Sequence, residues 1–258
     1  GNRQQWQEVV ADIPEKARLL ADAFWPGPLT LVLPKSDRVP NIVSAQKSTV
    51  AVRMPNHALT LALLQALPFP LAAPSANPFG TISPTTARHV ADYFGDSLSM
   101  VLDGGPAQQG IESTIVGFED GLPVMYRLGT ITQEEIEAVI GRVTVTNKNN
   151  HNPSAPGMLL KHYAPKTKLI LVEDLPGAVA QYAHQKIAIL SLQEKLTGHN
   201  IIQQVCLSES AHLPEAAAKL YASMMLLDLS GADLIIVKRL PETGIGKAIN
   251  DRLERAAS

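Results

Sequence analysis

The chain has 258 residues, of which 45% are hydrophobic and 18% charged, a balance typical of folded globular proteins rather than disordered ones. The net charge of −2 excludes a generally basic surface for nucleic acid, and the single cysteine excludes a disulfide framework or a multi-cysteine zinc site. No apolar run approaches the roughly 20 residues that span a bilayer. Because Gly1 to Glu8 also lack signal-peptide character, a reducing cytoplasm is the expected location.

The first half of the chain predicts alternating helices and strands. Asp12 is expected to cap a first helix, and Thr132 with Glu135 forms a capping-box pattern before a later one. Apolar periodicity predicts the remaining elements. Strands are expected at 29–33, 49–53, 71–73, 100–102, 113–116 and 124–127, and helices at 58–67, 84–94 and 133–140.

The stretch PLAAPSAN, residues 70–77, is the first candidate for a binding site. Its apolar run is stopped by Pro74, which predicts a buried strand ending at a loop. Ser75 and Asn77 follow directly, where α/β sheets bind ligands, and their offset of two residues lets both side chains face one bound molecule. The alternative is that Ser75 and Asn77 only form a turn between prolines.

Two further segments carry candidate polar groups. Thr49, Ala51 and Arg53 share one face of an alternating strand, so two small residues lie beside a cation. The alternative is a half-exposed strand with a solvated arginine. Ser83 precedes Pro84, a pattern that predicts a helix start whose hydroxyl and free N–H groups could meet an anion.

The second half begins with a linker-like composition at 143–157, rich in Thr, Asn, Lys, Pro, Ser and Gly. An adjacent His162 and Tyr163 follow, either as functional groups or as a surface loop with a packed tyrosine. Beyond Pro165, strands and helices alternate, which predicts a small, mostly parallel sheet covered by helices. The strands are expected at 169–172, 187–190, 201–207 and 234–237, and the helices at 177–184, 214–229 and 245–256.

Several motifs occur in an order that resembles the two-domain, YrdC-type family of threonylcarbamoyl-AMP synthases. They are FWPGPLTLVLP (24–34), TVAVRMP (49–55), APSAN (73–77), ESTIV (112–116), YRLG (126–129), SAPGMLLKHYAP (154–165) and GIGKAINDRLERAA (244–257). The resemblance implies an α/β protein with a YrdC-like twisted mixed sheet and helices at 1–142. An interdomain linker or lid is implied at 143–166, and a smaller Rossmann-like α/β domain at 167–258.

The resemblance also implies a reaction. L-threonine, bicarbonate and ATP would give threonylcarbamoyl-AMP and pyrophosphate, the first step of threonylcarbamoyladenosine formation in tRNA. ATP would be a substrate accompanied by Mg²⁺, and the product would pass to the downstream tRNA threonylcarbamoyl-transfer machinery, with indirect or weak tRNA contact and no membrane. Such chemistry requires positioning and cations rather than a nucleophilic side chain.

Residue roles follow from the matched motifs. Arg53 would pair with the threonine carboxylate, and Ala73 and Ser113 would line the threonine pocket. The resemblance assigns ATP contacts to Thr49, Ser75, Asn77, Ser83, Arg127, His162 and Tyr163. Within this set, Arg127 would neutralise nucleotide charge, while the His–Tyr pair would let the linker fold over the nucleotide as a lid that excludes water. No metal ligands are assigned.

One family feature is not matched, and three other interpretations stay open. A PTET-like strand and a Lys-x-Arg pair open the family's sequences, so this chain is expected to be an incomplete enzyme. The first alternative is therefore an inactive fragment. The second is an RNA-binding module of the same fold, disfavoured by the net charge and the acidic residues Glu134, Glu135 and Glu137. The third is a hydrogenase-maturation-type carbamoyl-transfer domain, disfavoured by the lack of zinc-finger cysteines.

Overall fold

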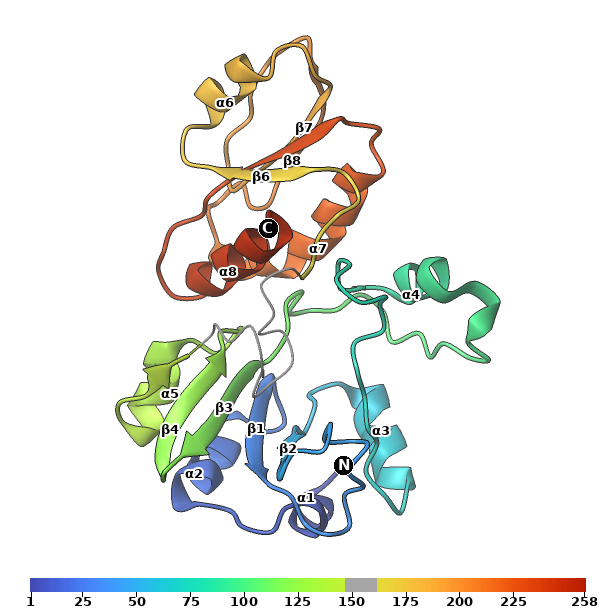
Figure 1. Cartoon of the computed structure of the whole chain (residues 1–258), viewed down its shortest axis with the longest axis vertical. Helices are drawn as coiled ribbons and strands as arrows, with labels where there is room; N and C mark the ends of the chain where they lie inside the picture. The colour runs from blue at the N-terminus through green and yellow to red at the C-terminus, as the bar shows by residue number, and fades with distance from the viewer. Residues whose placement is uncertain (147–161) are drawn as a thin grey trace. The chain divides into compact units, whose positions relative to one another are not determined.

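The computed structural model describes residues 1–146 and 162–258 (Figure 1). By their internal contacts, the residues form two compact units. The first unit comprises Gly1–Pro74 and Glu112–Met158, and the second comprises Ser75–Ile111 and Leu159–Ser258. Most of the linker expected at 143–166 lies outside the described residues, as do the first eight residues of its SAPGMLLKHYAP motif. In the described part of the chain, no helix combines the length and apolarity needed to cross a membrane.

The first unit contains a five-stranded mixed sheet with the order β2-β1-β3-β4-β5. β1 pairs in parallel with β3 and antiparallel with β2, while β4 pairs antiparallel with β3 and in parallel with β5. The predicted strands at 29–33, 49–53, 113–116 and 124–127 are confirmed. The strand bounds are β1 Leu29–Pro34, β2 Thr49–Val52, β3 Thr114–Glu119, β4 Leu122–Arg127 and β5 Thr144–Val145.

Two helices, α2 (Glu15–Phe24) and α5 (Gln133–Ile140), cover one face of this sheet and contact each other. Alternate residues of β1 point toward them, so Leu31 packs with Leu20 and Ile136 in one buried cluster. The capping box of α5 is confirmed, because the Thr132 and Glu135 side chains each bond the other residue's backbone N–H. This unit also contains the helices α1 (Arg3–Val9) and α3 (Ala58–Ala66). None of the residues of α3 is fully buried.

Two predicted strands are wrong. Residues 71–73 have irregular structure and are exposed, because prolines at 68, 70 and 74 remove the backbone donors that a strand ladder needs. Residues 100–102 are also irregular, and Met100 is 80% exposed. Apolar residues alone do not make a strand, and among the described residues no neighbouring strand supplies hydrogen bonds to this segment.

Two predicted helix caps are also wrong. The helix α4 spans Ala87–Phe94 and is capped by Thr86, whose hydroxyl oxygen accepts from the His89 amide at 3.2 Å. Ser83 lies too far upstream for this bond and is buried instead. Similarly, α2 is preceded by Pro14 at its cap position rather than by Asp12, so its first turn receives no side-chain cap.

The second unit contains a four-stranded, entirely parallel sheet with the order β6-β9-β7-β8. This arrangement confirms the predicted alternation of strands and helices. The elements are β6 Leu169–Val172, α6 Leu175–Gln181, β7 Ile187–Ser191, β8 Ile201–Cys206, α7 Leu213–Asp228, β9 Leu234–Lys238 and α8 Gly246–Ala256. The inner strands β7 and β9 are almost fully buried, as expected for strands covered on both faces.

Residues 75–111 join the second unit partly through a close approach at Gly110. This residue has a φ of +71°, and a Cβ atom there would lie 2.2 Å from the Ala217 carbonyl oxygen of α7. Only glycine permits both that backbone conformation and that approach. The end of the segment that carries α4 and the short 3₁₀ turn Gly95–Ser97 thereby lies against α7.

Candidate active site

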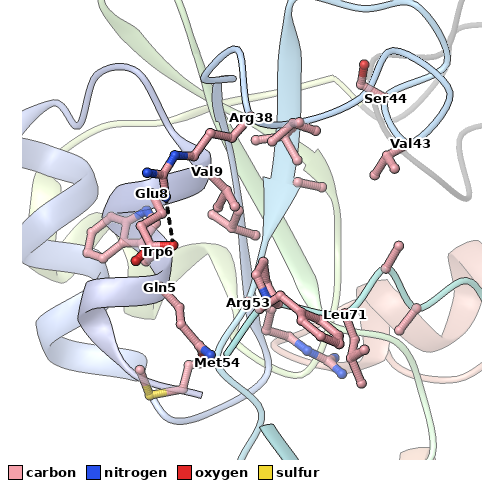
Figure 2. Close-up of a pocket in the computed structure, with 18 of the residues that line it drawn as sticks. Gln5, Trp6, Glu8, Val9, Arg38, Val43, Ser44, Arg53, Met54 and Leu71 are labelled. Carbon is pink, nitrogen blue, oxygen red and sulfur yellow. Dashed lines mark hydrogen bonds and ion pairs between the residues drawn. The ribbon is translucent and has the colours of Figure 1, made fainter. Parts of the chain in front are cut away.

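A cavity of about 1160 Å³ lies in the first unit and contains three of the predicted site residues, Thr49, Arg53 and Ala73 (Figure 2). Its wall combines α1, the strand β2 with the loop before it, and residues 68–74. Figure 2 shows Arg53, directly after β2, close to Leu71 on the opposite wall. The wall is largely apolar and also carries Arg53, Lys47 and the paired Arg38, an arrangement suited to a small amphiphilic anion.

The electrostatics of the site centre on two guanidinium groups. Desolvation lowers the pKa of Arg53, and the positive charge of Arg127 lowers it further. A guanidinium keeps its positive charge near neutral pH. Two like charges held close together repel each other, so an anion bound beside both would relieve that repulsion.

Arg127 is oriented by Ser113, a second predicted pocket residue. Its Nε donates to the Ser113 carbonyl oxygen and its Nη2 to the Ser113 hydroxyl oxygen, both at 3.0 Å. Ser113 is 3% exposed, and its hydroxyl also lies 2.7 Å from that of Thr30 on β1. Residues distant in the sequence therefore fix the plane of the Arg127 guanidinium near Arg53.

Gly129 supports this arrangement through its lack of a side chain. A Cβ atom there would lie 2.3 Å from the Thr114 amide nitrogen and 2.6 Å from the Ser113 carbonyl carbon. We expect Gly129→Ala to lower the free energy of unfolding by about 1–3 kcal/mol, because the backbone must shift. Since that shift moves Ser113, binding of the L-threonine that the family resemblance implies should weaken too. Urea unfolding and titration calorimetry measure the two effects.

The control for Gly129→Ala is Gly121→Ala in the β3–β4 turn. Gly121 has a φ of +77° and open space around its Cα, so alanine there strains only the turn. It should cost about 1 kcal/mol and leave threonine binding intact. An unchanged unfolding midpoint for Gly129→Ala would contradict the steric account.

The ten predicted site residues divide equally between the two units. The first unit holds Thr49, Arg53, Ala73, Ser113 and Arg127, and the second holds Ser75, Asn77, Ser83, His162 and Tyr163. Ser75 is exposed, whereas Ser83 is buried. The structure brings Arg53, Ser113 and Arg127 together in the first unit, and it brings the Asn77 segment and the His–Tyr pair together in the second.

Asn77 stabilises a turn while keeping one oxygen available. Its Nδ2 donates to the carbonyl oxygens of Pro78 and Thr81, each at 3.1 Å, as the turn interpretation expects. Its Oδ1 is buried and accepts no hydrogen bond from the residues that the structure describes. Because a buried acceptor without a partner is costly, this oxygen is suited to receive a ligand donor.

The segment of His162 and Tyr163 packs against residues within this turn. The His162 ring meets the Phe79 ring edge-on at 6.2 Å, and the Ala164 amide donates to the Gly80 carbonyl oxygen at 2.9 Å. Tyr163 is 2% exposed, so it packs as the surface-loop interpretation expected of a tyrosine.

Sequence reasoning missed several residues that line the cavity. Trp6 on α1 meets Trp25 edge-on at 5.0 Å, and Glu8 pairs with Arg38 at 3.1 Å (Figure 2). No local signal marks them, since α1 reaches the cavity only in the folded chain. Lys47 also lines the cavity and did carry a signal, because it continues the two-residue alternation of Thr49 and Arg53.

Family comparisons divide the chain into two matched regions. A family model described as "Telomere recombination" matches residues 1–129, and one described as "Threonylcarbamoyl-AMP synthase, C-terminal domain" matches residues 131–258. Together they define a two-domain α/β class of protein. The chain belongs to the threonylcarbamoyl-AMP synthase family.

Individual relatives agree with this assignment. The chain is 40% identical to the threonylcarbamoyl-AMP synthase of Bacillus subtilis, covering 98% of the chain and 76% of the relative. It is 38% identical to that of Pyrococcus abyssi, covering 98% and 77%. The crystal structure of P. abyssi Sua5 complexed with L-threonine matches all of this chain and 78% of its own, with a TM-score of 0.93 and 35% identity.

Proposed function

We propose that this chain catalyses the synthesis of threonylcarbamoyl-AMP from L-threonine, bicarbonate and ATP, with release of pyrophosphate. The observation that carries the proposal is the position of Arg53, a desolvated cation, in the wall of a cavity that Thr49 and Ala73 also line, in a chain from this family. A relative's structure with L-threonine bound supports it. The domain division at 1–142, 143–166 and 167–258 is part of the same proposal.

Arg53 would bind the threonine carboxylate through its two-pronged guanidinium, with Ala73 and Ser113 lining the side-chain pocket. The threonine amine attacks the bicarbonate carbon, so that a C–N bond forms, a C–O bond breaks and water leaves, giving a carbamate. A carbamate oxygen then attacks the α-phosphorus of ATP, a P–O bond forms, and the bond to the β-phosphate oxygen breaks as pyrophosphate leaves. The site contributes positioning and charge, since neither step uses a nucleophilic side chain. The volume of the cavity, about 1160 Å³, is larger than a single bound amino acid would fill.

The nucleotide contacts proposed here come from seven residues: Thr49, Ser75, Asn77, Ser83, Arg127, His162 and Tyr163. The free Oδ1 of Asn77 supports its place in the set, because an adenine amino or ribose hydroxyl group is a donor. Arg127 would stabilise the phosphate charge.

We propose that Mg²⁺ accompanies the triphosphate rather than occupying a protein cage. Among the described residues, no group of three or more His, Cys, Asp or Glu side chains is placed to hold a metal ion. The carboxylate that lines the described cavity, Glu8, pairs with Arg38. Mg²⁺ is commonly bound largely by substrate phosphates, where it neutralises charge.

The product would pass to the tRNA threonylcarbamoyl-transfer machinery in the cytoplasm. The net charge of −2 supports only indirect or weak contact with tRNA itself. An unstable mixed anhydride must be delivered before water hydrolyses it, which favours direct transfer to that machinery.

The test is pyrophosphate release and ATP consumption by the 258-residue chain, with and without L-threonine and bicarbonate. We expect release that depends on both compounds and yields threonylcarbamoyl-AMP by mass spectrometry. ATP hydrolysis that ignores threonine would contradict the synthase proposal, and so would a complete lack of turnover in the folded protein.

A second prediction concerns Tyr163 as part of a lid. Tyr163→Ala should raise the share of consumed ATP that appears as AMP rather than threonylcarbamoyl-AMP several-fold, because water would reach the intermediate. Tyr163→Phe keeps the ring and should behave more like the unmodified chain. Equal AMP shares for Tyr163→Ala and the unmodified chain would contradict a lid role.

A further inference from the structure

We infer that Tyr221 and Arg252 form a clamp that positions Tyr163, so that the C-terminal domain acts on the synthase reaction by holding this residue in place. We call these two residues the Tyr163 clamp. The inference rests on the proposed function, and it assigns the C-terminal domain a positioning role. All of the contacts involved lie within the second unit.

The clamp holds the Tyr163 ring from two helices. Tyr221 on α7 stacks on it with centroids 5.4 Å apart and an interplanar angle of 26°. Arg252 on α8 places its Cζ 5.8 Å from the ring centroid. Tyr221 and Arg252 are 1% and 0% exposed, so water does not weaken the attraction between the guanidinium and the ring.

Arg252 is itself held by a buried carboxylate. The Asp251 Oδ2 lies 3.1 Å from Arg252 Nη1, and the same carboxylate accepts from Arg255 Nε and Nη2 at 3.1 and 2.9 Å. Because the carboxylate offsets two buried positive charges, it limits the desolvation cost of placing Arg252 beside an aromatic ring. The carboxylate therefore orients the guanidinium independently of Tyr163.

The backbone at Tyr163 shows why a clamp is needed. Its φ of +64° lies in the left-handed region, which costs free energy for a residue with a side chain. Such a conformation persists only where the surroundings impose it. Besides the ring contacts, the His162 amide donates to the Arg255 carbonyl oxygen at 3.3 Å.

The other side of the segment meets the loop after Asn77. The Ala164 amide bonds Gly80, and Thr81 forms an isolated parallel bridge with Ala164. Farther along, the Asp228 carboxylate at the end of α7 accepts from the Lys166 and Thr167 amides at 3.1 and 2.7 Å. Residues 162–167 are therefore fixed between the C-terminal helices and a loop proposed to bind ATP.

The test compares Arg252→Met and Tyr221→Leu with a matched control, Arg239→Met, in the 258-residue chain. Arg239 makes ion pairs with Glu173, Glu242 and Glu254, all of which lie outside residues 162–167. Two quantities are measured. The first is hydrogen exchange of the amides of His162 and Ala164, and the second is the share of consumed ATP that appears as AMP.

We expect both clamp variants to exchange these amides about tenfold faster than the unmodified chain and to raise the AMP share about as much as Tyr163→Ala does. Simple loss of folded protein would leave that share unchanged, because it removes active molecules without altering their partitioning. Arg239→Met should change neither quantity, and Arg252→Lys, which keeps the charge, should recover part of the protection.

Unchanged exchange in both folded clamp variants would overturn the clamp. Faster exchange with an unchanged AMP share would overturn its role in the reaction, while leaving the proposed function standing. If the unmodified chain has no synthase activity, both the proposed function and the positioning role fail. The hydrogen-exchange data would still show whether Tyr221 and Arg252 hold residues 162–164 in place. Because the two variants remove separate contacts to the ring, a variant that does not fold leaves the other to decide.

Discussion

Arg53→Ala is expected to lower kcat/KM for L-threonine by about two orders of magnitude or more. Threonine-dependent pyrophosphate release would then be close to background. The substrate carboxylate would lose its guanidinium partner, and only the nearby charge of Arg127 would be left to offset its own. Initial rates at several threonine concentrations provide the measurement. The ATP concentration should be saturating, so that threonine binding alone limits the rate.

The controls for Arg53→Ala separate charge from geometry. Arg53→Lys keeps the charge but loses the two-pronged bonding, so its activity should fall between those of the unmodified chain and Arg53→Ala. Arg88→Ala removes an exposed arginine that pairs with Asp92 on α4, and its kinetics should match the unmodified chain. Turnover by Arg53→Ala at the unmodified rate would remove Arg53 from the site.

Asp251→Asn should produce the largest loss of stability. The carboxylate joins Arg252 and Arg255, and all three side chains are at least nine-tenths buried. Removing one charge from a buried ion-pair group leaves uncompensated charge, which costs about 3–5 kcal/mol. The free energy of unfolding, measured in urea and followed by circular dichroism, should fall by that amount.

An exposed ion pair on the same helix gives the comparison for Asp251→Asn. Glu254 pairs with Arg239 at 2.8 Å, and its side chain is 42% exposed. Because solvent screens such pairs, Glu254→Gln should cost less than about 1 kcal/mol. A loss for Asp251→Asn as small as that of Glu254→Gln would show that burial does not make this ion-pair group structural.

Some elements were predictable because short stretches determine them. The strands of the C-terminal sheet are short apolar runs bounded by polar residues, and burial on both faces keeps such runs uninterrupted. The Thr132 and Glu135 capping box was predictable because both partners lie within one helical turn. The family motifs around Arg53, Ser113 and Arg127 could likewise be identified from the sequence, since each motif consists of a few consecutive residues.

Other features depended on partners far away in the sequence. Residues 71–73 read as a strand by composition, yet a strand exists only where another strand supplies hydrogen bonds, and none pairs there among the described residues. Thr86 rather than Ser83 caps α4. A capping side chain must reach the amide of the third helical residue, and Ser83 lies too far before the helix to do so.

The sequence by itself determined the α/β class, most elements of the second sheet and the family motifs around Arg53, Ser113 and Arg127. The tertiary structure decided that Arg127 is oriented by Ser113, that Trp6 lines the cavity, and that Tyr221 and Arg252 hold Tyr163. The physical reason is the range of the interactions. Apolar periodicity and helix caps depend on interactions between residues a few positions apart in the sequence. Ring stacking and buried ion pairs join side chains that only the folded chain brings together.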